Sequence, residues 1–142
     1  MRKTALVIGL VTAASFGYAA QGAVVTYHAN LSAASEVPPV QSAGKGTATI
    51  NVDPATKELS WRVDYSGLTG PAAAAHIHCG AAAGANAGVS VPFGTGQAVA
   101  SPIQGSGKMT DAQLADLQAG KCYVNVHTAA NKGGEIRGQL SR

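Results

Sequence analysis

Charged and aromatic side chains are scarce in this 142-residue sequence, in which 12% of the residues are charged and 5% are aromatic. Proteins that bind nucleic acids need a basic surface to neutralise phosphates, and many also stack bases on aromatic side chains. The formal net charge is only +3. Without the basic residues at positions 2 and 3, the 10 basic residues become 8 against 7 acidic ones, which leaves +1. The composition therefore predicts no nucleic-acid binding.

Long hydrophobic runs are also missing. A membrane-spanning helix needs roughly 20 apolar residues, and the apolar segment 4–18 is shorter and interrupted by glycine. Because this segment follows Arg2 and Lys3 and precedes small residues suited to cleavage, it is typical of a secretory signal peptide. We predict a signal peptide over residues 1–22 and one domain over residues 23–142. The domain is expected to be exported to the periplasm or cell exterior, without stable membrane insertion.

Cysteine is limited to two residues, Cys79 and Cys122. In an exported chain of this size two cysteines most often pair, so we predict a disulfide between them. Two alternatives stay open at this point: buried free thiols, and thiolates that bind a metal. Thiolate binding would require the cysteines to share a strand face with histidines, which the alternation described below argues against.

Carboxylates are absent from the two segments that hold three of the four histidines, residues 76–79 and 122–127. Calcium and magnesium prefer clusters of oxygen ligands, so these segments do not suit either ion. No Ser-His-Asp spacing appears in the chain, and both cysteines are expected to be oxidised. The sequence thus argues against hydrolytic catalysis and favours a binding protein over an enzyme.

The two segments read His76-Ile77-His78-Cys79 and Cys122-Tyr123-Val124-Asn125-Val126-His127. Side chains of an extended strand point alternately to its two faces. In each segment the histidines therefore share one face, and the cysteine shares the other face with aliphatic residues. This parity predicts a cluster of three imidazoles backed by a disulfide.

The three imidazoles of His76, His78 and His127 are the predicted metal ligands. A His-x-His strand places two imidazoles about 7 Å apart on one face, a span that one metal ion can bridge. If Cys79 lies opposite Cys122 in antiparallel strands, His127 is diagonal to His76, at about 7–8 Å. If the cysteines instead meet across the core from two sheets, the bond still fixes the relative position of the strands.

Copper is the predicted metal, with zinc as the alternative, because all-nitrogen ligation with an open position suits both and copper binds more tightly. His28 is the candidate fourth ligand, since it lies on the polar face of the first strand. The competing hypothesis is a metal-free structural or protein-interaction module, in which the histidines are exposed or make structural hydrogen bonds. The expected partners are a metal ion and another exported protein; the sequence predicts no oligomeric state.

Alternating apolar residues between turns predict an all-β fold, an antiparallel sandwich or Greek-key barrel. Strands are expected at 25–31, 47–52, 59–65, 76–79, 89–93, 98–103, 122–127 and 135–140. One short helix is expected at about 111–119, because Thr110 and Gln113 have the spacing of a capping box and Gly120 can end it. Residues 80–88, nearly all Gly, Ala and Asn, are predicted to be a flexible loop, with a plain linker favoured over a lid on the histidine site.

Four motifs in order resemble the chordin-type (CHRD) domain over about residues 26–140. They are Glu36-Val37-Pro38-Pro39-Val40, Ala75-His76-Ile77-His78-Cys79-Gly80, Tyr123-Val124-Asn125-Val126-His127-Thr128 and Gly134-Glu135-Ile136-Arg137-Gly138-Gln139. The resemblance implies an immunoglobulin-like antiparallel β-fold in an exported, single-domain member. It implies little about activity.

A weaker resemblance concerns the histidines alone, whose pattern is similar to the copper ligands of Cu/Zn superoxide dismutases. This resemblance implies a copper-ligand role for His76, His78 and His127 only. The bridging histidine and zinc-loop ligands of those enzymes have no counterpart in residues 80–88, and Glu135 stands where they have a guiding arginine. A copper-dependent, dismutase-like redox enzyme is therefore a further alternative to a mononuclear binding protein.

Overall fold

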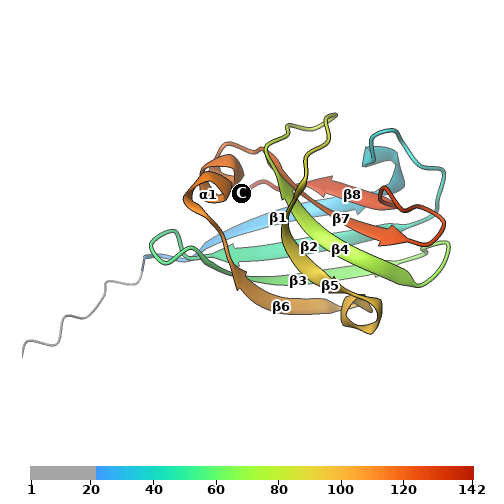
Figure 1. The fold of residues 1–142 in the computed structure, drawn as a ribbon, viewed down its shortest axis with the longest axis horizontal. Coiled ribbons are helices and arrows are strands. Elements are labelled where there is room, and N and C mark those ends of the chain that lie inside the picture. The colour runs from blue at the N-terminus through green and yellow to red at the C-terminus, as the bar shows by residue number, and fades with distance from the viewer. Residues whose placement is uncertain (1–21) are drawn as a thin grey trace, which may run out of the picture.

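Eight antiparallel strands form one sheet that curls into a nearly closed barrel (Figure 1). The computed structural model describes residues 22–142, so the predicted signal peptide, apart from Gly22, lies outside the described residues. The strand order around the barrel is β5-β4-β7-β8-β1-β2-β3-β6, which leaves β5 and β6 as the two edges. The predicted all-β fold is confirmed.

Within residues 22–142, the structure has eight strands, one α-helix and two short 3-10 helices. The strands are β1 (Val25–Ser32), β2 (Lys45–Val52), β3 (Glu58–Ser66), β4 (Ala72–Cys79), β5 (Val89–Thr95), β6 (Ile103–Lys108), β7 (Cys122–Thr128) and β8 (Ile136–Gln139), with the helix α1 (Asp111–Gln118) and short 3-10 helices η1 (Ala33–Ser35) and η2 (Gly96–Val99). Within residues 22–142, the structure contains no helix with the length and apolarity that a membrane crossing needs.

The helix α1 forms where the capping box predicts it. The Thr110 side chain accepts a hydrogen bond from the Gln113 amide, and the Gln113 side chain accepts one from the Thr110 amide. These two bonds satisfy amides that the first turn of a helix leaves without partners. Gly120 has a φ of +72°, the left-handed conformation that ends a helix.

The interior of the barrel is filled by the apolar face of each strand. On β3, Trp61 and Val63 are buried while Arg62 between them is exposed, as alternation predicts. The Trp61 ring stacks on Phe93 of β5, with centroids 4.5 Å apart and planes inclined by 20°. This aromatic pair packs next to the gap between the edge strands.

The Trp61 ring lies against Gly105, its direct partner on β6. A Cβ at Gly105 would be only 2.5 Å from Trp61 Cζ2, and Phe93 stacks on that ring, which limits its movement. We expect Gly105→Ala to lower the free energy of unfolding by about 1–3 kcal/mol, the usual cost of overpacking. Urea unfolding followed by tryptophan fluorescence measures this, with Gly88→Ala as the control, because among the described residues no atom beyond Gly88 and its two chain neighbours lies within 4 Å of a Cβ there. Equal unfolding midpoints for the two variants would contradict the prediction.

The strand predicted over residues 98–103 is wrong. The chain forms η2 over Gly96–Val99, and β6 begins only at Ile103. Val99 and Ile103 are both fully buried, but they belong to different elements. The true strand has almost no apolar residues, because glycines on β6 pack under the Trp61 ring in place of side chains. Its sequence therefore lacks the alternation by which strands are recognised.

Candidate metal site

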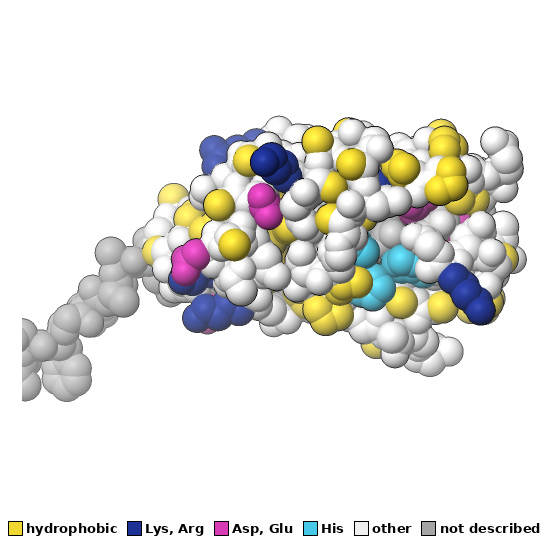
Figure 2. Space-filling view, turned by 45° about the horizontal axis from the view of Figure 1, so that its top comes forward, with side chains coloured by type: hydrophobic (Ala, Val, Ile, Leu, Met, Phe, Trp, Pro, Cys, Tyr) yellow, Lys and Arg dark blue, Asp and Glu magenta, His cyan; other side chains and the backbone are white. Residues whose placement is uncertain are grey.

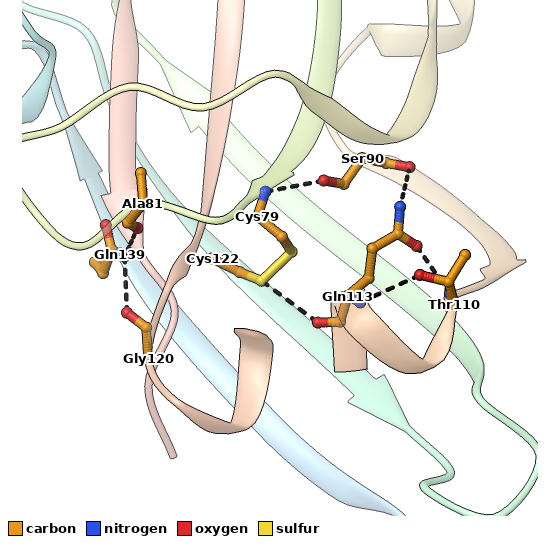
Figure 3. Close-up of a disulfide and its surroundings, with 8 residues drawn as sticks. All are labelled: Cys79, Ala81, Ser90, Thr110, Gln113, Gly120, Cys122 and Gln139. Carbon is orange, nitrogen blue, oxygen red and sulfur yellow. Dashed lines mark hydrogen bonds between the residues drawn. A yellow bond between two sulfur atoms is a disulfide. The ribbon is translucent and has the colours of Figure 1, made fainter. Parts of the chain in front are cut away.

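The predicted disulfide between Cys79 and Cys122 is confirmed. The two cysteines are direct partners on the antiparallel strands β4 and β7, with Cα atoms 4.1 Å apart, and do not join two sheets across the core. Figure 3 shows its surroundings: the Cys79 amide donates to the Ser90 hydroxyl, and Cys122 Sγ contacts the Gln113 carbonyl of α1. The bond thus pins the register of β4 against β7 and lies beside β5 and α1.

This register places the three predicted ligands together. His76 lies opposite Asn125, and His127 lies two residue pairs further along, opposite Ala74. One nitrogen from each of His76, His78 and His127 lies within 4.8 Å of the others. His76 Nδ1 and His127 Nε2 are 3.0 Å apart. Figure 2 shows histidine side chains gathered at one place on the surface, partly covered by neighbouring atoms.

Hydrogen bonds to backbone carbonyls orient two of these rings. His127 Nδ1 is 2.9 Å from the Lys132 carbonyl oxygen, and His78 Nδ1 is 2.9 Å from the Ala87 carbonyl oxygen. Because a carbonyl oxygen only accepts, each Nδ1 carries the proton in the neutral ring. The lone pair is then on Nε2, the nitrogen left for a metal.

His76 and His127 are held in the neutral form. Burial, together with the smaller effects of the neighbouring His127 and His78, lowers the pKa of His76 from 6.5 to about 4. Burial also lowers the pKa of His127; the Lys132 carbonyl opposes this shift and His78 adds to it. Neutral imidazole is the form that binds metal ions, so these rings need not lose a proton at neutral pH before binding one.

The family model of the CHRD domain matches residues 27–140. The chain belongs to the CHRD domain family. The matched residues include the three clustered histidines and both cysteines, as the motif resemblance predicted. Neither the curated proteins nor the solved structures include a significant match to this chain.

The Gly80–Gly88 loop of the CHRD domain is hydrogen-bonded over the histidines. Arg137 donates to the Ala85 carbonyl oxygen at 2.7 Å and to Asn86 Oδ1 at 2.9 Å. The Tyr123 hydroxyl and His78 both contact the backbone of Ala87. The prediction of a plain flexible linker is therefore wrong, and the alternative of a lid fits the contacts better. Sequence could not reveal this, because the loop offers mainly backbone carbonyls, which every residue type has.

Three planar groups stack beneath this loop. The Arg137 guanidinium carbon is 3.5 Å from the centroid of the Tyr123 ring, and the Tyr123 and His78 rings are parallel within 3° with centroids 4.8 Å apart. Arg137 is only 1% exposed. The stack fixes the plane of the His78 ring, and it leaves Arg137 occupied inside the fold. Arg137 thus does not serve as a surface arginine like the guiding residue of a dismutase.

His28 lies elsewhere in the CHRD domain. It is on β1, which is separated from β7 by β8 in the sheet, and its side chain is exposed beside Thr49. It is not among the grouped donors. The expectation that His28 joins the site as a fourth ligand is therefore not met. The sequence indicated which face of its strand His28 lies on, but it did not indicate which strands lie next to that strand.

Two buried polar residues beside the histidines, Glu36 and Asn125, were not predicted as site residues. Asn125 is 2% exposed and its Oδ1 is 3.0 Å from His78 Nε2. Glu36 is 5% exposed; burial raises its pKa to about 7, although Arg137 and Asn125 act to lower it. Alternation already put Asn125 on the histidine face of its strand, and this signal could have identified it. Glu36 comes from a proline-rich loop without periodicity, so no local signal placed it here.

Proposed function

We propose that this CHRD domain is an exported copper-binding protein in which His76, His78 and His127 hold one copper ion. A single observation supports this most: three imidazoles from two paired strands have nitrogens within 4.8 Å of one another. Two of these rings are oriented by carbonyl oxygens, the outer-shell arrangement common around metal-bound histidines. The proposed role is to bind, deliver or sequester copper, and export rests on the N-terminal sequence.

All-nitrogen ligation suits both copper and zinc, and copper binds such sites more tightly, so copper is the proposed metal. Zinc remains the alternative metal.

The metal-free alternative explains the same contact as a hydrogen bond between His76 and His127. Copper titration of the purified protein, followed by EPR, distinguishes the two hypotheses. We expect hyperfine structure from three nitrogens. We expect the His76→Ala/His127→Ala double variant to lose at least about 100-fold in Cu(II) affinity, because two of three ligands are gone. Bound copper should also raise the melting temperature, since it binds only the folded chain.

His28→Ala is the matched control in this experiment, because it removes an exposed histidine that is not among the grouped donors. Its affinity should equal that of the unaltered protein. An EPR spectrum without nitrogen hyperfine structure would refute the proposal, and so would a double variant that binds copper as tightly as the unaltered chain. Metal analysis of protein purified from its own export compartment then identifies the native metal.

A further inference from the structure

We propose that Asn125 supplies a fourth ligand, the oxygen Oδ1, to the same metal ion, which makes the site three nitrogens and one oxygen. This inference rests on the proposed function and adds a residue to it. Asn125 lies on β7, opposite His76 on β4, and is 2% exposed. Its Oδ1 is 3.0 Å from His78 Nε2, the same separation as between His76 Nδ1 and His127 Nε2.

The orientation of the Asn125 amide follows from the groups around its nitrogen. Asn125 Nδ2 is 3.4 Å from the Gly133 carbonyl oxygen, which can only accept a hydrogen bond. The carboxylate of Glu36 is also near this nitrogen. Both groups lie against Gly134: a Cβ added there would be 2.3 Å from Glu36 Oε1 and 2.6 Å from Asn125 Nδ2. Two acceptors near Nδ2 fix the amide with its nitrogen toward them, so that Oδ1 faces His78.

Two lone pairs therefore face each other between His78 and Asn125. The proton of neutral His78 is on Nδ1, because Nδ1 meets the carbonyl oxygen of Ala87. His78 Nε2 then has a lone pair, and so does Asn125 Oδ1 at 3.0 Å. Two buried acceptors at this distance repel each other, and a metal ion that binds both lone pairs would remove this repulsion.

A metal ion bound by these two atoms would also be close to the other imidazoles. The His78 ring centroid is 5.5 Å from that of His76 and 6.2 Å from that of His127, and one nitrogen from each ring lies within 4.8 Å of the others. One ion would thus be shared by the three imidazoles and the Asn125 oxygen, a nitrogen and oxygen donor set that suits Cu(II).

Glu36 is the positioning residue for this ligand. Its Oε1 is buried and accepts no hydrogen bond from residues 22–142, so an N–H that points toward it is favourable. Arg137 contributes a positive charge near the carboxylate. Together with the Gly133 carbonyl, Glu36 keeps the amide nitrogen of Asn125 away from the histidines and thereby keeps Oδ1 toward them.

The direct test labels the side-chain carbonyl carbon of asparagine with carbon-13 in the otherwise unaltered protein and records electron-nuclear double resonance of the Cu(II) form. If Asn125 Oδ1 binds copper, its carbonyl carbon shows a resolved hyperfine coupling, which is lost in Asn125→Ala. Because the unaltered chain is used, the result does not depend on the stability of a variant. A spectrum with three nitrogens and no carbon-13 coupling would overturn the fourth ligand but leave the three-histidine site intact.

The second test exchanges the side-chain head groups of Glu36 and Asn125. Glu36→Gln/Asn125→Asp keeps the net charge and an amide-carboxylate pair, but puts a carboxylate oxygen where Oδ1 was. We expect Cu(II) affinity at least equal to that of the unaltered protein, whereas Asn125→Ala should lose about tenfold to hundredfold. If Asn125 only positioned His78, the exchange should lower copper affinity as Asn125→Ala does; that result would overturn the proposal. Asn30→Ala, which removes an exposed asparagine from β1, is the control.

Discussion

Replacing Glu135 by glutamine is expected to lower the free energy of unfolding by at least about 3 kcal/mol, the cost of disrupting a fully satisfied buried charge. Glu135 is 0% exposed and lies directly before β8. Its carboxylate accepts hydrogen bonds from the Ser42 and Thr128 hydroxyls, the Thr69 amide and hydroxyl, and the Asn131 side chain. It thus ties three separate segments, around residues 42, 69 and 128–131, to the end of the barrel.

The amide of Glu135→Gln would have one oxygen where the carboxylate has two. Donors now bound by the second oxygen would face an N–H group, so several buried donors would lose their acceptor. Urea unfolding at neutral pH measures the difference. Glu58→Gln is the control, because Glu58 is exposed at the start of β3. A Glu135→Gln midpoint equal to that of the control would show that the buried carboxylate contributes little.

The same residue gives a pH dependence with a defined sign. Burial alone would raise the pKa of Glu135, but hydrogen bonds from Ser42, Thr128 and Thr69 outweigh it and lower the pKa from 4.5 to about 2. Stability from this group is therefore complete above the unfolded pKa of 4.5 and is lost as the pH falls toward about 2. The stability gap between the unaltered protein and Glu135→Gln should narrow across this pH range. A constant gap would contradict the shift.

Removing the disulfide is expected to have a comparably large effect. Cys79 and Cys122 are 43 residues apart in sequence, and closing a loop of that length in the unfolded chain corresponds to about 4 kcal/mol of stability. The Cys79→Ala/Cys122→Ala variant should lose about this amount in urea unfolding. Alanine is chosen because Cys122 is fully buried, where a serine hydroxyl would add an unpaired polar group.

A reducing agent provides the matched control for the disulfide. It should destabilise the unaltered protein by the same amount and leave the double-alanine variant unchanged. If the variant unfolded at the same urea concentration as the oxidised protein, the bond would not contribute to stability. The copper affinity of the variant is informative as well, because the bond pins the register that places His76 opposite Asn125.

Local sequence determined which face of its strand each side chain occupies. Alternation along residues 76–79 and 122–127 separates histidines from cysteines, and the structure has both the predicted disulfide and the predicted grouping of His76, His78 and His127. The capping box located the helix in the same way. These features follow from the period of a single element, which the chain contains within a few residues.

Tertiary structure alone decided which surfaces meet. Closure of the barrel set β8 between β7 and β1, which keeps His28 on a strand away from the cluster. The same closure brought Glu36 and the Gly80–Gly88 loop against the face of β7 that carries Asn125. The contacts that hold them there come largely from backbone carbonyls and buried polar groups. No residue pattern encodes these contacts, because they depend on segments that are distant in sequence and become neighbours only when the sheet closes.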